Sequence, residues 1–134
     1  MNERTKRILM EQKTAIFNNL TDTFHLPIFE DEIAEDEEKD LDANGYNCFI
    51  LETGDLRATR DIKTLNQDIF IIYYSENKDD VDEKVIDIIS LVSSVKAVTF
   101  ASSRKDRLQK KNTDRFIDRI ELRFVRRVPL ERKV

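Results

Sequence analysis

The sequence is poor in several residue types on which particular classes of protein depend. Its 134 residues include two glycines, two prolines, one cysteine, one histidine and no tryptophan. Two glycines, Gly45 and Gly54, are too few for the glycine-rich loops that cradle phosphates. One cysteine, Cys48, excludes an internal disulfide framework and favours a reducing cytoplasm. No apolar run approaches the ~18 residues of a membrane-spanning helix, so we expect no membrane association.

The chain also lacks a convincing catalytic or metal-binding motif. Nucleophilic catalysis needs a Ser or Cys beside a base, whereas His25 stands alone and no motif surrounds Cys48. Residues 40–45, Asp-Leu-Asp-Ala-Asn-Gly, match the opening half of a calcium-binding EF-hand loop. The position of its closing glutamate, however, holds Leu51. We therefore expect no enzyme, no cofactor and no metal site.

Charge is abundant and unevenly distributed along the chain. Charged residues make up 37% of the sequence, against a usual share of about 25%. Residues 28–44 hold nine acidic residues and one lysine, whereas residues 104–134 hold twelve basic and five acidic residues. This asymmetry indicates directional contacts, with an unlike partner or head-to-tail between copies. The alternative is a solvated acidic loop and a charged sheet face.

Hydrophobic periodicity predicts two helices. The first spans about Glu3–Phe24, with Asn2 as its cap. The second carries an apolar stripe from Val81 to Val92, and Asp80 with Glu83 has the spacing of a capping box. Residues 28–46 hold too few apolar side chains to pack, so beyond a short strand near Ile28 they are expected to form an acidic mobile loop.

Four longer segments read as strands, at Asn47–Thr53, Leu65–Ser75, Val95–Ser102 and Arg115–Val128. Gly54-Asp55 is expected to end the first of them. The last alternates apolar residues on one face with arginines on the other, a period of two. The sequence thus predicts an α+β fold, with two helices on one face of a mainly antiparallel sheet in the order α-β-β-α-β-β. We expect one domain over 1–134, with 129–134 as a tail.

This layout resembles the tail completion or tail terminator proteins of long-tailed phages, and most closely the tail-to-head joining proteins of siphophages that infect Gram-positive bacteria. The resemblance covers nearly the whole chain. It lies in Phe49–Asp55, Gln67–Tyr74, Asp79–Glu83 and Thr113–Ile120.

The resemblance implies a structural protein that forms a six-fold ring, caps the tail tube and offers the docking surface for the DNA-filled head. Its implied partners are the major tail tube protein, the head-completion (connector) protein, further copies of itself and, without specificity, passing DNA. It implies a place in the virion, at the head–tail interface, after assembly in the host cytoplasm.

The candidate interface residues are charged side chains of the hairpin loop, of the segment before the last strand, of the last strand and of the acidic segment: Arg57, Arg60, Arg104, Lys105, Arg107, Lys110, Lys111, Arg119, Arg123, Arg126, Arg127, Glu35, Asp36, Glu37 and Glu38. An alternative is a small nucleic-acid-binding or adaptor domain that uses the basic C-terminal strand. Acidic residues interleave with the arginines there, which suits protein contacts better than phosphate contacts.

Overall fold

A computed structural model describes residues 1–109 and 113–131 of the chain. Within these ranges the elements follow in the order α1 (Glu3–Phe24), β1 (Ile28–Glu30), α2 (Glu35–Asn44), β2 (Cys48–Ala58), β3 (Thr64–Glu76), α3 (Val81–Ser93), β4 (Val98–Gln109) and β5 (Phe116–Pro129). The expected α+β class is confirmed.

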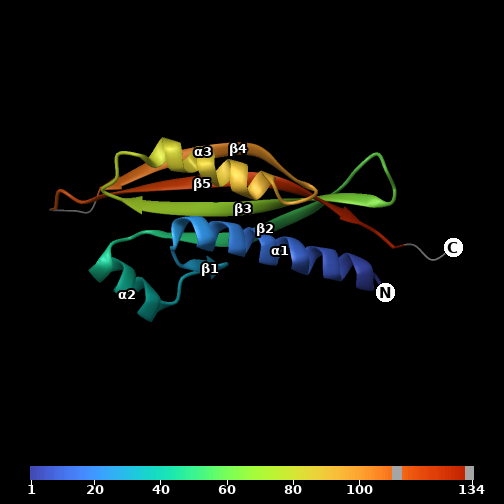
Figure 1. The fold of residues 1–134 in the computed structure, drawn as a ribbon, viewed down its shortest axis with the longest axis horizontal. Helices are drawn as coiled ribbons and strands as arrows, with labels where there is room; N and C mark the ends of the chain where they lie inside the picture. The colour runs from blue at the N-terminus through green and yellow to red at the C-terminus, as the bar shows by residue number, and fades with distance from the viewer. Residues whose placement is uncertain (110–112, 132–134) are drawn as a thin grey trace.

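The five strands form one sheet in the order β1-β2-β3-β5-β4. Only β1 runs parallel to its neighbour β2, and the other pairings are antiparallel. The central strands β3 and β5 pair along the whole of β3, from Thr64 opposite Pro129 to Glu76 opposite Ile117. One edge is the three-residue β1, and the other is the twelve-residue β4 (Figure 1).

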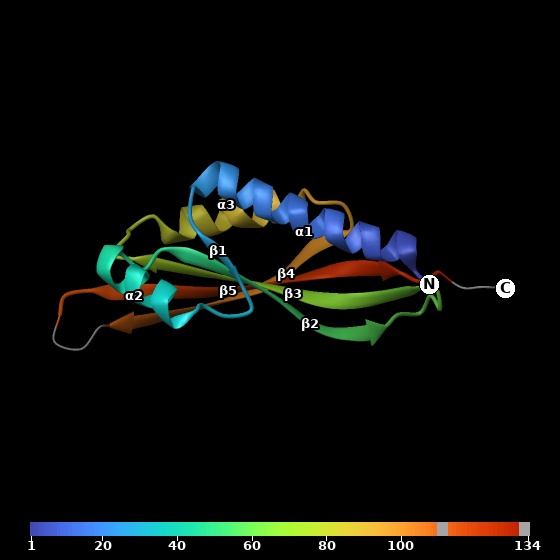
Figure 2. The ribbon, with the colours of Figure 1, turned by 90° about the horizontal axis from the view of Figure 1, so that it is seen from below.

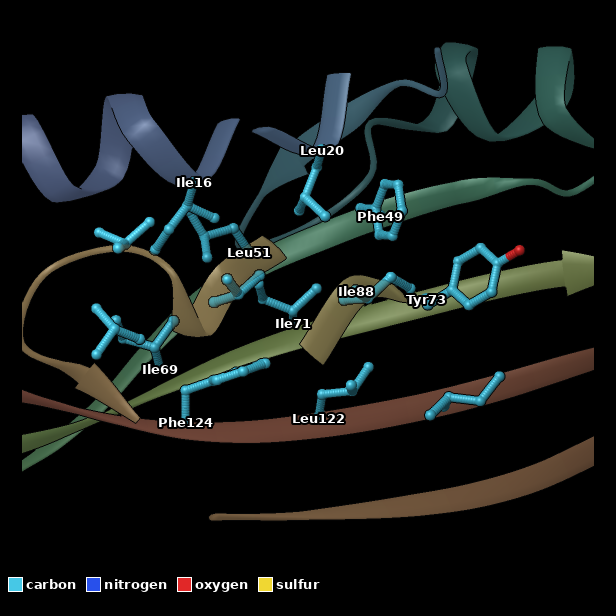
Figure 3. Close-up of a cluster of buried hydrophobic side chains, with 14 of the residues drawn as sticks. Ile16, Leu20, Phe49, Leu51, Ile69, Ile71, Tyr73, Ile88, Leu122 and Phe124 are labelled. Carbon is cyan, nitrogen blue, oxygen red and sulfur yellow. The ribbon is translucent and has the colours of Figure 1, made fainter. Parts of the chain in front are cut away.

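Helices α1 and α3 cover one face of this sheet (Figure 2). Alternate residues of a strand point to the same face, so every second side chain of β2, β3 and β5 meets the helices. These strands and the two helices contribute the fully buried apolar side chains shown in Figure 3, which include Ile16, Leu20, Phe49, Ile69, Ile71, Tyr73, Ile88, Leu122 and Phe124. The opposite face of the sheet, here called the open face, is not covered by α1 or α3 (Figure 2).

The acidic segment differs from its prediction, because Glu35–Asn44 forms helix α2. The expectation of an irregular loop over residues 28–46 is therefore wrong, as is the count of two helices. Leu41 is buried and attaches this short helix to the rest of the fold. The acids of its first turn lie at the positive end of the helix dipole, which stabilises them.

Two strands extend well beyond their predicted ends. Strand β2 passes through Gly54-Asp55 with a shift of register between Thr53 and Leu56, so this dipeptide forms a bulge rather than an end. A Cβ on Gly54 would lie 2.9 Å from the ring of Phe70. This close contact explains why a glycine occupies the position. Strand β4 reaches Gln109 and includes Arg104, Lys105 and Arg107, which were expected to lie between strands.

The predicted helix caps occupy their positions without making the predicted bonds. Asn2 and Asp80 are the N-cap residues of α1 and α3, but neither side chain makes a capping hydrogen bond. The Oδ1 atom of Asn2 instead accepts a hydrogen bond of 2.9 Å from the backbone N–H of Glu131. The Thr5 hydroxyl donates to the carbonyl oxygen of Pro129 at 2.7 Å. These two bonds fix the start of α1 to the end of β5.

Two isoleucines of α3 provide a matched test of the core. Ile88 is fully buried, whereas Ile86 is 63% exposed. Ile88→Ala should lower the free energy of unfolding by about 2–5 kcal/mol, because it removes buried methyl groups and leaves a cavity. Ile86→Ala should change it by no more than about 0.5 kcal/mol. Urea titration followed by circular dichroism measures both, and similar losses for the two variants would contradict the packing of α3.

Candidate interaction surfaces

The open face of the sheet carries ion pairs that join neighbouring strands. Asp68 of β3 lies between two arginines: one carboxylate oxygen is 2.7 Å from Nη1 of Arg57 on β2, and the other is 3.3 Å from Nη1 of Arg123 on β5. The hydrogen bond from Arg57, together with the two nearby positive charges, holds the pKa of Asp68 below its usual value. These predicted interface arginines are thus engaged within the molecule.

A second group continues the pairing along β5. The Nε atom of Arg119 donates to the hydroxyl of Tyr74 at 3.2 Å, and its Nη1 lies 3.3 Å from the carboxylate of Glu121. Tyr74 in turn makes an edge-to-face contact with Tyr46, with ring centroids 5.1 Å apart. Opposite charges on adjacent strand positions stabilise a sheet modestly, so the open face is charged yet largely neutralised.

Strand β4 presents three of the predicted basic residues at the sheet edge, and they differ in their surroundings. Arg104 has a side chain 79% exposed and lies 3.5 Å from Asp106 of its own strand. Lys105 reaches Asp82 of α3 at 3.2 Å. Arg107 makes two bonds, of 2.9 and 3.2 Å, to the carboxylate of Asp118, which is fully buried. Arg107 therefore compensates the charge of the buried Asp118. Arg104 has the most exposed side chain of the three and is the most accessible to a partner.

Helix α2 carries the opposite charge. Glu35, Asp36, Glu37 and Glu38 are all exposed, and within the described part of the chain none of them forms an ion pair. The helix lies at the end of the molecule opposite the start of α1, beside the β1 and β2 edge of the sheet (Figure 1). The acidic segment and β4 thus lie at opposite edges of the sheet.

The remaining predicted residues are dispersed. Arg60 lies in the turn after β2 and Arg127 near the end of β5, and both are exposed. Arg126 is only 8% exposed, so its expected position on the surface is wrong. It lies two residues after Phe124, so its side chain is on the same face of β5, under the helices. Its guanidinium donates to Oε1 of Gln67 at 2.9 and 2.6 Å. Lys110 and Lys111 lie outside the described residues.

The EF-hand-like residues do not form a loop. Residues 40–44 belong to α2, so their side chains project around a helix instead of converging. Among residues 1–109 and 113–131, no group of three or more His, Cys, Asp or Glu side chains could hold a metal ion. Cys48 is fully buried, and desolvation raises the pKa of its thiol to about 12, which leaves it unreactive near neutral pH.

The sequence reasoning missed a groove that α1 forms with the loop between α3 and β4. Arg4, Arg7 and Lys96 line this groove, and Arg127 borders it from β5, at the strand position next to the helix-facing Arg126. The spacing of Arg4 and Arg7 places both on one side of α1, but Lys96 and Arg127 join them only through the fold. In the part of the chain that the structure describes, no helix is long and apolar enough to cross a membrane.

Comparison with known proteins does not assign the chain to a family. No family model matches the sequence, and no curated protein is significantly similar to it.

Arg107 and Arg104 lie three residues apart on β4 and allow a controlled test of the buried carboxylate. Arg107→Ala should lower the free energy of unfolding several-fold more than Arg104→Ala, because it leaves the buried Asp118 without its partner. Adding Asp118→Asn to Arg107→Ala should restore part of the loss. Denaturant unfolding measures all three variants. Equal losses for the two single variants would show that Arg107 does not compensate Asp118.

The ion pairs of Asp68 predict a dependence of stability on pH. Its pKa is lowered in the folded state, so its stabilising contribution is present above the unfolded pKa of about 3.9 and is lost as the pH falls through the folded pKa. The melting temperature of the wild type should therefore fall more steeply below about pH 4 than that of Asp68→Asn. Thermal melts at several pH values measure this, with the exposed Asp36→Asn as the reference. Parallel curves for wild type and Asp68→Asn would refute the prediction.

Proposed function

We propose that the chain is a structural phage assembly protein, which caps the tail tube and forms the docking interface that joins the tail to the DNA-filled head. It would act in the virion by shape and charge complementarity, without catalysis. Its partners would be the major tail tube protein, the head-completion protein and further copies of itself in a ring, six-fold by the resemblance of its layout to tail completion proteins.

The observation that carries this proposal is the long, charged edge strand β4. It spans twelve residues, and its outer side pairs with no other strand in the described part of the chain. An edge of this kind presents backbone donors and acceptors to a partner strand. Arg104 and Lys105 are adjacent on it and project to opposite faces. Complementary charge would select the partner and fix the register.

The separation of charge supports the same proposal. Acidic α2 lies at one edge of the sheet and basic β4 at the other (Figure 1). Identical subunits that form a ring must meet through two unlike surfaces. A protein seated between a tube and a head also needs two different surfaces for two different partners. A chain whose charges are segregated in this way meets both requirements.

The alternative of a nucleic-acid-binding domain has less support. Such a domain holds its arginines free for phosphate groups, whereas Arg119 and Arg123 of β5 bind the carboxylates of Glu121 and Asp68. The basic C-terminal strand is therefore mostly neutralised by its own neighbours. An adaptor domain that binds a cellular protein would use the same free edge but would not bind tail tubes.

Binding to tail tubes tests the proposal directly. Purified chain is mixed with tubes of a siphophage tail, sedimented and viewed by negative-stain electron microscopy, and density should appear at one end of each tube. Arg104→Glu should lower the fraction of capped ends at least about tenfold at equal concentration, because like charges would then face each other across the contact. Arg107 is left unchanged because it compensates Asp118.

The control is Lys78→Glu, which makes the same change of charge at an exposed position of the loop between β3 and α3. It should cap tubes as the wild type does. Failure of the wild type to bind tube ends would overturn the assembly function. Equal capping by Arg104→Glu would retain the function and remove β4 from the interface.

A further inference from the structure

The basic groove lies apart from the edge strand β4 and from helix α2, which form the surfaces proposed above. It measures about 830 Å³ and is lined by Arg4 and Arg7 of α1, Lys96 of the loop before β4 and Arg127 of β5. One carboxylate, Glu11, also lines it. All four cations are exposed, and none of them forms an ion pair with a residue that the structure describes.

Several like charges around one hollow repel one another and create a positive potential, which an anionic occupant would relieve. Apolar side chains also line the groove, among them Ile8, Ala15 and Val95. Gln12 is buried there: its Nε2 donates to the carbonyl oxygen of Lys96 at 3.1 Å, while its Oε1 has no donor among the described residues. The groove therefore suits an occupant that combines negative charge with a small apolar surface.

The acidic segment of this same chain has that chemistry. Glu35–Glu38 form the first turn of α2, are exposed and lack ion pairs within the described residues. Ile33 and Ala34 precede them and are themselves partly or fully exposed. One helical turn is ~5.4 Å long and ~10 Å across, or roughly 400 Å³, so the groove has room for this turn but not for the whole helix.

The positions of the two features decide how they can meet. The groove is lined by residues of α1 between Arg4 and Asn19 and by the loop after α3. Helix α2 lies at the end of the molecule opposite the start of α1 (Figures 1 and 2). A chain cannot insert its own acidic turn into its own groove. Two copies can do so in a head-to-tail arrangement, which leaves one free groove and one free acidic turn for the next copies.

We infer that the basic groove binds the acidic first turn of α2 from a second copy of the chain. This inference rests on the self-association that the proposed function requires, and it names the two surfaces that make it. Such a contact is heterologous, so it closes into a ring if its rotation fits and continues as a filament if it does not.

Sedimentation velocity of the purified full chain tests the contact. At about 0.01 M salt, where charges act over ~30 Å, the wild type should form species larger than the monomer as its concentration rises. At about 1 M salt, where the range is ~3 Å, the same samples should return to the monomer. A wild type that stays monomeric at low salt, up to the highest concentration that remains in solution, overturns the inference.

Neutralising variants identify the two surfaces. A groove variant, Arg4→Gln with Arg7→Gln, and a helix variant, Glu35→Gln and Asp36→Asn with Glu37→Gln and Glu38→Gln, should each associate at least about tenfold more weakly than the wild type. The matched control, Lys6→Gln with Lys78→Gln, removes two exposed cations outside the groove and should associate like the wild type. Circular dichroism verifies that each variant is folded.

A mixture of the two variants gives the sharpest test. The groove variant keeps a native acidic turn and the helix variant keeps a native groove, so one contact remains possible between them. The mixture should form one-to-one dimers that do not grow further. A mixture that stays monomeric, or two variants that each associate like the wild type, would overturn the contact even if α2 were partly unfolded in the helix variant.

The same variants separate this inference from the proposed function. If the wild type caps tail tubes but its self-association does not depend on the groove or the acidic turn, the inference fails and the function stands. If association depends on both surfaces but the wild type does not bind tubes, the contact stands and the tail function fails.

Discussion

The pairing of β3 with β5 is the constraint on which the rest of the structure depends. The two strands run side by side along the whole of β3, and the period of two assigns each of their residues to one face. A slip of one residue would turn Leu122 and Phe124 to solvent and bring Arg123 under the helices. The register that builds the core therefore also brings Asp68 and Arg123 together on the open face.

The open face is only partly covered, since Ile50 and Ile72 on it are buried while most of its charged side chains are not, and this explains how the molecule accommodates so much charge. Charged side chains on the open face stay in contact with water and pair across strands, which costs little desolvation. The charges thus fall into two groups. Those in the middle of the sheet, such as Arg57 and Arg119, find partners within the molecule. Those at its ends, such as Glu35 and Arg4, do not, and they remain available for other molecules.

Features set by local pattern could be predicted from the sequence, and features set by tertiary contacts could not. The stripe of α3, the run at Ile69–Tyr74 and the alternation of β5 identified the α+β class, because hydrophobic periodicity reports burial directly. Helix α2 could not be predicted, because Leu41 is its single buried residue and the sequence therefore shows no apolar stripe there. In the sequence Arg126 looks like the other arginines of β5. It lies two residues after Phe124, however, and therefore faces the helices. The basic groove could not be predicted for another reason. Its basic residues come from three segments that are far apart in the sequence.

The edge strand β4 also affects how the protein behaves before it meets any partner. A long unpaired edge invites indiscriminate pairing with other extended chains, which leads to aggregation. Two features of β4 oppose such aggregation. Arg104 and Lys105 repel other basic strands, and a bulge between Phe100 and Ser102 interrupts the regular ladder. An apolar strand would have to desolvate these charges without compensation. The edge should therefore disfavour pairing with the hydrophobic segments of nascent chains and favour a strand of complementary charge.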